Sequence, residues 1–300
     1  ENTVFRIVAT DGEEFALRVH RDGYHDMAEL ESEHEWTAAL AAAGLFVPQG
    51  ILTRKGRAYA TVALPNSDRT RHVGLVKWIQ GTTLAMDLGQ TPGASEVSFV
   101  YESLGQVIAD FHLATAKWAP SPGFKRHSWD AEGLVGENPF WGRFWEIEAP
   151  SDDHRVKLSV LRTQLADILS DMPQDESAYG MIHADLHANN VLRDGDKLSV
   201  IDFDDAGFGW HAYDLAVAIW DRMDVLTGQT YFDVAYNALL KGYRSRRGDC
   251  DRIIEHVPLF LLIRSLILLR WMQDRPEVGY TTFIPKLLDL ALAQAREILL

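Results

Sequence analysis

Three polar residues stand in an order that could support chemistry on a phosphate: Asp185, Asn190 and Asp202. Two short apolar runs, 191–193 and 198–201, flank an Asp-Gly pair, which predicts two strands joined by a hairpin turn. The hairpin would bring Asn190 near Asp202, and Mg²⁺ accepts amide and carboxylate oxygens together with substrate phosphates. Asp185, in the polar loop before the hairpin, could then accept a proton from an attacking hydroxyl. The three residues therefore predict a site for phosphoryl transfer from ATP.

The sequence around these residues resembles known kinases. The order His-x-Asp-Leu-x-x-x-Asn followed by Asp-Phe resembles the catalytic loop and metal-binding aspartate of protein kinases. More closely, HADLHANNVL and VIDFDDAGFGWHAYDLA resemble the aminoglycoside phosphotransferase family, a kinase-fold group with choline, homoserine and fructosamine kinase relatives. The resemblance implies that Asp185 is the catalytic base and that Asn190 and Asp202 hold Mg²⁺. It also implies that Asp214 is a structural carboxylate that supports the catalytic loop.

Two departures from the protein-kinase pattern favour a small-molecule acceptor. Ala184 stands where many protein kinases carry the arginine that receives an activation-loop phosphate, and Asp204 stands where their Asp-Phe-Gly has glycine. Only a short segment separates Asp202 from Asp214, so a long activation segment does not fit there. The resemblance therefore implies constitutive action on the hydroxyl of a small molecule.

A zinc site is a rival interpretation of the same stretch, because His183 and His187 are four positions apart. The metalloprotease pattern places a glutamate directly after the first histidine and sets both histidines on a helix. Here Ala184 follows the first histidine, and a predicted strand precedes it. The context therefore favours phosphoryl transfer over zinc.

The composition of the chain indicates which kinds of partner it can bind. Its 300 residues suffice for one large domain or two smaller ones, and 47% of them are hydrophobic. The formal charge of −14 argues against non-specific binding to nucleic acid and is compatible with a cationic substrate. The single cysteine, Cys250, excludes an internal disulfide and favours a cytoplasmic location. The oligomeric state is not indicated.

The segment 257–269 is the one apolar run that resembles a membrane span. It is too short to cross a bilayer and carries Arg264 in its middle, so we expect a buried helix and no membrane partner. No signal peptide is visible, and because the chain begins with Glu1 we expect its natural start to lie upstream.

The first predicted hairpin consists of two alternating segments, 3–8 and 15–20, on either side of Asp11-Gly12. In the family, a glycine-rich nucleotide loop lies at or before the first of these strands. This sequence shows no G-x-G-x-x-G there. The resemblance implies that Glu1-Asn2 is the end of that loop.

Arg18 stands where kinases carry the phosphate-binding lysine, and a guanidinium group also binds phosphate. The next predicted helix, 24–43, carries Glu33 on its apolar stripe. An inward-facing carboxylate needs a cationic partner, and Arg18 is the candidate. The pair would match the Lys–Glu ion pair of kinases. The alternatives are a surface arginine on an edge strand and a glutamate that reaches water.

The remaining strands of the small sheet are expected at 50–53 and 57–63, as a second hairpin, and at 73–79. In the family, the hinge that holds the adenine ring through backbone groups follows the last strand. The matching groups here are the carbonyl of Lys77 and the amide of Ile79, with Val76 at the back of the pocket. These three assignments come from the resemblance alone.

Helical periodicity dominates from Leu84 onward. The expected helices span 95–114, 153–169, 211–223, 231–244, 252–272 and 282–299. His112, beside the apolar stripe of the first of these, is expected to be a structural histidine. The segment 120–139, rich in glycine, proline and aromatic residues, is expected to be a surface loop.

Five residues lie in or near segments that form the acceptor side of the cleft in this family: Trp220, Asp221, Asp224, Trp271 and Asp274. One interpretation is an aromatic and acidic pocket for an amine-bearing substrate. The other is that the tryptophans belong to the core and the aspartates to the solvated surface.

The implied fold is α+β and bilobal, like that of protein kinases. We expect an N-terminal nucleotide-binding lobe, 1–81, with a small antiparallel sheet and one main helix, ending in the hinge. A mainly α-helical lobe, 82–300, should carry the catalytic loop and the acceptor site. ATP and Mg²⁺ are the expected cofactors.

Three hypotheses about function follow from these observations. The first is a kinase that moves the γ-phosphate of ATP to a small-molecule hydroxyl, of the aminoglycoside, choline or homoserine type. The second is a bacterial Ser/Thr protein kinase of the stress-response type, which belongs to the same group. The third is a non-catalytic nucleotide-binding pseudokinase, motivated by Arg18 and by the missing glycine-rich loop.

Overall fold

The computed structural model describes residues 2–65, 67–89, 91–148, 151–223 and 231–299. The chain forms two compact units, each built from three segments. Unit 1 comprises Glu1–Asp87, Lys117–Arg126 and Asn189–Asp204, and unit 2 comprises Leu88–Ala116, His127–Ala188 and Asp205–Leu300. The division of function between lobes 1–81 and 82–300 stays a prediction.

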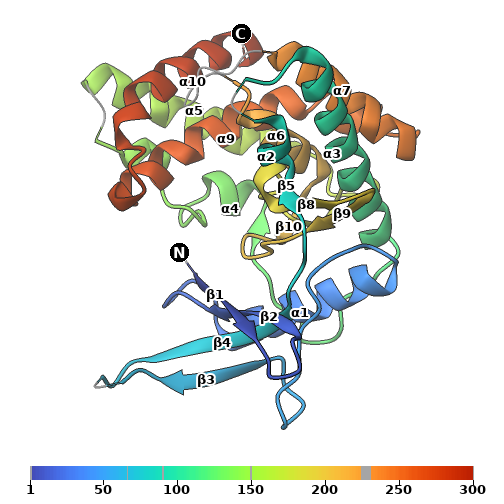
Figure 1. Ribbon diagram of the computed structural model, residues 1–300. Helices are drawn as coiled ribbons and strands as arrows, with labels where there is room; N and C mark the ends of the chain where they lie inside the picture. The colour runs from blue at the N-terminus through green and yellow to red at the C-terminus, as the bar shows by residue number, and fades with distance from the viewer. Residues whose placement is uncertain (1, 66, 90, 149–150, 224–230, 300) are drawn as a thin grey trace. The chain divides into compact units, whose positions relative to one another are not determined.

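An antiparallel sheet of four strands, in the order β1-β2-β4-β3, runs through unit 1 (Figure 1). Its strands are β1 (Thr3–Val8), β2 (Glu14–Val19), β3 (Tyr59–Ala63) and β4 (Thr70–Lys77). The predicted hairpin around Asp11-Gly12 is confirmed, and Gly12 takes the positive φ of 89° that favours glycine. Arg18 lies within β2, opposite Val4 of β1 and Gly74 of β4.

The second predicted hairpin, 50–53 with 57–63, is confirmed only at its turn, where the Thr53 amide donates to the Arg57 carbonyl and the Gly56 amide to the Thr53 carbonyl, both over 2.8 Å. The predicted pairing of its two strands is wrong. The strand β3 pairs with residues 70–74 of β4, whereas the segment before β3 contacts the other end of β4. There, Gly50 forms a bridge with Val76, and the Ile51 amide donates to the Leu75 carbonyl over 2.7 Å. The alternation of apolar residues predicted extended chain but did not specify which strand it pairs with.

Helix α1 (Met27–Ala42) begins after its predicted start at Tyr24 because Asp26 caps it. Oδ1 of Asp26 accepts from the Glu29 amide, and Oε2 of Glu29 accepts from the Asp26 amide, both over 2.9 Å. This capping box satisfies two backbone amides at the start of the helix. Glu33 lies on the buried face, as predicted, with 3% of its surface exposed.

A small second sheet in unit 1 contains the hairpin predicted before Asp202. β8 (Val191–Asp194) pairs with β9 (Lys197–Val200), and Val191 lies opposite Val200. β5 (Thr82–Thr83) pairs with β8 on the other side and was not predicted, because two residues show no periodicity. Gly81 before it takes a φ of 131° and approaches the Arg193 backbone so closely that a Cβ would lie 2.5 Å from that carbonyl oxygen.

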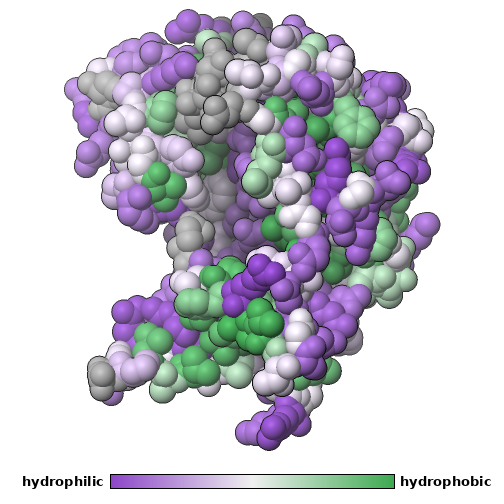
Figure 2. All heavy atoms as spheres, viewed as in Figure 1, coloured by the Kyte–Doolittle hydropathy of each residue, from purple (hydrophilic) through white to green (hydrophobic). Residues whose placement is uncertain are grey.

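Figure 2 shows hydrophobic side chains gathered over the four-stranded sheet of unit 1. The edge strand β1 contributes Val4, Phe5, Ile7 and Val8, which are between 39% and 60% exposed. The buried core of unit 1 lies elsewhere, where Leu30, Trp36 and Leu40 of α1 are almost fully buried. Trp36 meets the ring of Phe203 edge to face, so the core also fixes the residue that follows Asp202.

Unit 2 is mainly helical (Figure 1). Its helices are α3 (Ala94–Thr115), α4 (Ala131–Val135), α5 (Asp152–Asp171), α6 (His211–Trp220), α7 (Phe232–Arg246), α8 (Asp251–Ile254), α9 (Val257–Gln273) and α10 (Ile284–Leu299), and α2 (Leu84–Leu88) spans the boundary between the units along the chain. α9 packs against α6 and α10, and α3 packs against α7. Glycines allow α3 and α7 to approach closely. A Cβ on Gly105 or on Gly242 would lie 2.0 Å from a backbone oxygen of the facing helix.

Three strands of unit 2 form a sheet in the order β6-β10-β7. They are β6 (Ser128–Trp129), β7 (Tyr179–Ile182) and β10 (Gly207–Trp210). β7 is the predicted strand before the polar loop, whereas β10 was not predicted. The segment 120–139 is not simply a surface loop, because it contains β6 and α4, which are too short to show a period.

The predicted helix 252–272 is two helices, α8 and α9. Pro258 lies in the first turn of α9, where its missing amide costs no helical hydrogen bond, so it favours a new start there. Arg264 lies in this buried helix, as expected. None of the helices that the structure describes is long and apolar enough to cross a membrane.

Candidate active site

The hairpin of unit 1 brings the two predicted metal ligands to its ends. Asn190 closes a 3-10 turn, η2 (Ala188–Asn190), and its carbonyl oxygen accepts from the Ile201 amide over 2.9 Å. The next residue, Asp202, takes a left-handed φ of 66° and leaves 54% of its side chain exposed. A carboxylate and an amide are a donor set that suits a hard divalent cation, and this backbone hydrogen bond brings the two chain positions close together. The residues present therefore fit Mg²⁺.

The predicted ion pair between Arg18 and Glu33 is present in unit 1. Nη1 of Arg18 donates to Oε1 of Glu33 over 2.6 Å, and the two side chains are 13% and 3% exposed. Burial alone would raise the pKa of Glu33, but Arg18 and then Arg126 hold it at about 2. The pair is therefore ionised at neutral pH, and neither the surface arginine nor the solvated glutamate occurs.

Arg126 is a second, unpredicted cation at this position, and its side chain is fully buried. Nη1 lies 3.7 Å from Oε2 of Glu33 and donates to the Glu29 carbonyl over 3.3 Å. Nη2 donates to the carbonyl oxygens of Phe203 and Asp204 over 3.1 and 2.6 Å. Arg126 thus ties helix α1 to the residues that follow Asp202.

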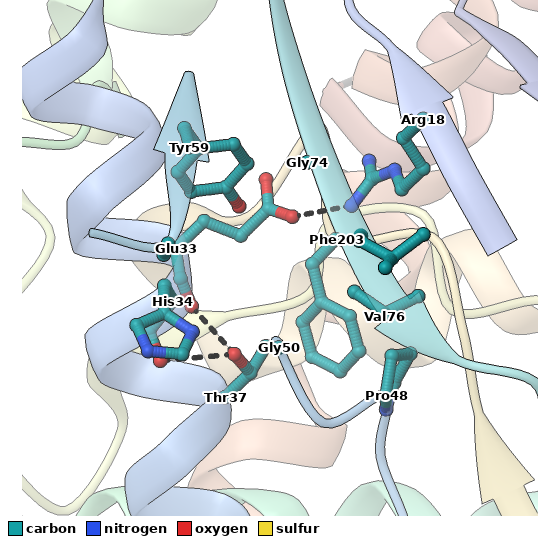
Figure 3. Close-up of a pocket in the computed structure, with 12 residues that line it drawn as sticks. Arg18, Glu33, His34, Thr37, Pro48, Gly50, Tyr59, Gly74, Val76 and Phe203 are labelled. Carbon is teal, nitrogen blue, oxygen red and sulfur yellow. Dashed lines mark hydrogen bonds and ion pairs between the residues drawn. The ribbon is translucent and has the colours of Figure 1, made fainter. Parts of the chain in front are cut away.

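A pocket of unit 1 lies beside this ion pair (Figure 3). Its empty volume, counted out to its open mouth, is about 390 Å³. The labelled residues come from α1, from the segment that holds Pro48 and Gly50, from β2 to β4 and from Phe203. Val76 lies on one wall and the ion pair on another. The predicted position of Val76 on a pocket wall is consistent with this geometry, although its contact with adenine stays a prediction.

The predicted hinge groups follow at the end of β4. The Lys77 amide donates to the Gln49 carbonyl over 2.9 Å, and the Trp78 amide to the Glu14 carbonyl over 3.0 Å. The Ile79 amide has no hydrogen-bond acceptor among the residues that the structure describes. The roles of the Lys77 carbonyl and the Ile79 amide in holding adenine stay predictions.

Asp185, the predicted base, lies in unit 2 between two cations. Its Oδ1 accepts from Nη2 of Arg264 over 2.8 Å, and its Oδ2 lies 3.3 Å from Nε2 of His187. Burial would raise the pKa of Asp185, but His187 first and Arg264 next hold it well below its ordinary value. The carboxylate is therefore ionised and oriented at neutral pH.

The loop that carries Asp185 is fixed by Asp214, as predicted. The carboxylate of Asp214 accepts from the amides of His183 and Ala184 over 3.1 and 2.7 Å. Its Oδ2 also lies 3.0 Å from Nε2 of His112, so the expectation of a structural role for that histidine is confirmed. Ala184 takes a positive φ of 62°, a strained conformation that these hydrogen bonds maintain.

His183 and His187, the two histidines of the zinc alternative, both contact groups of unit 2. Nδ1 of His183 accepts from the Asp185 amide over 3.3 Å, and Nδ1 of His187 lies 4.0 Å from Oδ2 of Asp221. His187 therefore faces two carboxylates. Burial alone would lower its pKa, but Asp185 and then Asp221 raise the pKa of His187 to about 9.

Sequence reasoning missed Arg264 as a neighbour of the base. Nη1 of Arg264 donates to the Tyr213 hydroxyl over 3.2 Å, and its guanidinium stacks 4.6 Å from the ring of Trp141. The available signal was a lone arginine in an apolar helix, which requires a buried anionic partner. The sequence did not show that Asp185 is that partner.

The acceptor-side residues divide between the two interpretations. Trp220 belongs to the core, 4% exposed, with Nε1 donating to Oγ of Ser265 over 3.0 Å. Asp274 pairs with Arg270 over 2.8 Å. Asp221 is 42% exposed beside His187, and Trp271 is half-buried. Asp224 lies outside the described residues.

The chain matches the model of the phosphotransferase enzyme family over residues 1–248, and it belongs to that family. It is 25% identical over 294 residues to the amicoumacin kinase of Bacillus subtilis (strain 168), which covers 93% of this chain and 80% of that one. Its fold is similar to that of a microcompartment-associated aminopropanol kinase, with a TM-score of 0.76 and 28% identity over 98% of this chain and 90% of that one. The fold of the amicoumacin kinase hAmiN, solved with AMP-PNP, Ca²⁺ and Ami, gives the same TM-score of 0.76 at 18% identity, with 96% and 86% covered.

These comparisons confirm the predicted family, the kinase-like α+β fold and the enzyme class. The chain is a phosphotransferase of the kinase type that uses a small-molecule hydroxyl as acceptor. The protein-kinase and pseudokinase hypotheses are not favoured, because the named relatives are small-molecule kinases.

Proposed function

We propose that this enzyme transfers the γ-phosphate of ATP, with Mg²⁺, to the hydroxyl of a small amino alcohol. The observation that carries the proposal is the carboxylate of Asp185, held ionised by Arg264 and His187 on a loop that Asp214 fixes. This arrangement supplies an oriented acceptor for the proton of a hydroxyl nucleophile.

The nucleotide is assigned to residues of unit 1. Asn190 and Asp202 would hold Mg²⁺, which when bound neutralises charge on the phosphates. Arg18, oriented by Glu33, would contact phosphate oxygens with its guanidinium group. The Lys77 carbonyl and the Ile79 amide would hold the adenine ring, and Val76 would lie at the back of its pocket.

The acceptor is assigned to residues of unit 2. Asp185 takes the proton of the hydroxyl, whose oxygen forms a bond to the γ-phosphorus. The bond from the γ-phosphorus to the bridging oxygen of ATP breaks, and ADP leaves with that oxygen and its electron pair. Asp185 does not need to be a strong base, because such transfer relies mainly on positioning and charge stabilisation.

Three observations support an amine-bearing acceptor. Asp221 is 42% exposed and lies beside His187 on the side opposite Asp185, so it offers a carboxylate to an ammonium group. The aminopropanol kinase, at 28% identity, is named for a substrate that carries both an amine and a hydroxyl. The net charge of −14 also favours a cationic ligand.

We also propose a cytoplasmic location, which fits an enzyme that uses ATP.

Turnover over a panel of acceptors tests this proposal. ADP release would be measured with 1-amino-2-propanol, ethanolamine, choline, homoserine, aminoglycosides and a generic protein, with Mg²⁺ and with Asp185→Asn as control. We expect turnover with one or more amino alcohols, lost in the variant. Turnover confined to acceptors without an amine would contradict the acceptor class, and phosphorylation of the protein alone would contradict small-molecule action.

A further inference from the structure

We propose that Asp204 is a positioning residue for Arg18, and that the two residues act as a coupled pair in binding the nucleotide phosphates. This inference rests on the proposed function, because it assigns Arg18 to those phosphates. It adds a second partner to the ion pair between Arg18 and Glu33 and gives a reason why position 18 is an arginine.

The guanidinium of Arg18 is held by a different carboxylate on each of its two arms. Nη1 donates to Oε1 of Glu33 over 2.6 Å, and Nη2 donates to Oδ1 of Asp204 over 2.8 Å. Asp202 is farther away, with 4.0 Å between its Oδ1 and the same Nη2. The two hydrogen-bonded carboxylates therefore fix the plane of the guanidinium group, and Asp202 adds only a longer ion pair to it.

An arginine needs this second partner more than a lysine would. A lysine presents one ammonium group, whereas an arginine presents a planar fork whose arms point in different directions. Only 13% of the Arg18 side chain is exposed, so an arm without an acceptor would lose its hydration without replacement. Protein kinases, which carry lysine at the position of Arg18, carry glycine at the position of Asp204. At both positions this sequence therefore departs from the protein-kinase pattern.

Asp204 is itself held rigidly in unit 1. Its second carboxylate oxygen, Oδ2, accepts from Nδ2 of Asn2 over 2.6 Å. Its carbonyl oxygen lies 2.6 Å from Nε2 of His25 and accepts from Nη2 of Arg126 over 2.6 Å. A carboxylate fixed at both oxygens and at its backbone can hold the orientation of Arg18.

The same contacts distinguish Asp204 from a metal ligand. Both of its carboxylate oxygens are engaged by side chains, and its side chain is 14% exposed. Asp202, two positions earlier, is 54% exposed. We therefore assign Asp202 to the metal and Asp204 to Arg18.

A double-mutant cycle tests the coupling. Arg18→Lys, Asp204→Ala and the double variant would be compared with the unmodified protein by calorimetric titration with ATP and Mg²⁺, and separately with adenosine. We expect each single change to weaken ATP binding about tenfold. If the two residues are coupled, the double variant should bind ATP about as tightly as the single variant with the lower affinity. Adenosine binding should stay unchanged, because it has no phosphates for Arg18 to contact. A general loss of structure would weaken both ligands.

Two further variants serve as controls. Asp204→Asn keeps the shape of the side chain and an oxygen for Arg18, so it should recover part of the lost ATP affinity. Asp22→Ala removes an exposed carboxylate of the same unit that pairs with Arg69 and Arg71, and it should bind ATP like the unmodified protein.

Three outcomes would overturn the inference. Additive losses in the double variant would mean that Asp204 acts independently of Arg18. Asp204→Ala could instead change the Mg²⁺ concentration needed for ATP binding. If that change were the same whether position 18 is arginine or lysine, Asp204 would be a metal ligand. Failure of the unmodified protein to bind ATP at all would refute the proposed function and this inference with it. That result differs from normal ATP binding with additive losses, which would refute this inference alone.

Discussion

Nη2 of Arg264 donates a hydrogen bond to Oδ1 of Asp185 over 2.8 Å, although the two residues are 79 positions apart in the chain. His187 approaches the other oxygen of the same carboxylate, Oδ2, at 3.3 Å. The candidate base is thus held at both oxygens by cations from different elements of unit 2. This arrangement orients the carboxylate and keeps it ionised, and it determines how the enzyme should respond to mutation and pH.

Replacing Asp185 with asparagine should remove transfer without removing the nucleotide. The side chain keeps its shape and can still accept from Arg264, but it cannot take a proton. We expect turnover to fall by about 100-fold or more, the usual contribution of a general base, with the affinity for ATP little changed. Steady-state kinetics and calorimetric titration would measure the two quantities. Full activity of the variant on a true substrate would show that the base is wrongly assigned.

Replacing Arg264 with methionine should move the acid limb of the pH–rate profile to higher pH. Arg264 contributes to holding the pKa of Asp185 below its ordinary value, so its loss lets that pKa rise and protonation begin at higher pH. Arg264→Lys keeps a charge and should show a smaller shift. Arg296→Met, an exposed position on α10, is the matched control. An unshifted acid limb in Arg264→Met would mean that the contact does not act on the base.

The ion pair of His187 should make folding stability depend on alkaline pH. The pKa of His187 is raised to about 9 in the folded protein, above about 6.5 for an unperturbed histidine. A raised folded pKa gives stability that is fully present below the unfolded value and is lost as the pH rises through the folded value. Thermal melts between pH 6 and pH 10 should therefore show a decline that is smaller in His187→Asn. Parallel declines in both proteins would rule out this role.

Removing Arg126 should destabilise unit 1 strongly. Arg126→Leu leaves the buried Glu33 with one cation fewer and frees the carbonyl oxygens of Phe203 and Asp204. Breaking a buried pair of this kind typically costs about 3 kcal/mol of unfolding free energy. Lys125→Ala is the control, since its ion pair with Asp26 is exposed and should matter little. Urea denaturation would compare the two, and equal effects would contradict the assignment.

Asp202→Ala should abolish the Mg²⁺-dependent part of ATP binding. The exposed carboxylate is the main charged donor of the proposed metal site, and an alanine offers no oxygen in its place. Titration with ATP should give the same weak affinity with and without Mg²⁺, whereas adenosine should bind as before. Asp196→Ala, an exposed position in the turn of the same hairpin, should keep the Mg²⁺ dependence. Retained Mg²⁺ dependence in Asp202→Ala would place the metal elsewhere.

The sequence by itself determined the elements whose signals are local. The turn at Asp11-Gly12, the β8–β9 hairpin and the long apolar stripe of α3 all follow from residues close together in the chain. It also indicated the pair of Arg18 with Glu33, because an acid on an apolar stripe requires a cation and Arg18 stands where the kinase pattern places one.

Only the tertiary structure decided which distant groups complete these sites. Arg264 beside Asp185, Arg126 against α1 and Asp204 on the second arm of Arg18 each join residues that no local period relates. The pairing of Gly50 and Ile51 with β4, which the sequence did not predict, has the same origin. Turns, caps and periodic faces depend on short-range sterics and hydrogen bonds, whereas the partner of a buried charge depends on which packed arrangement satisfies every buried polar group at once.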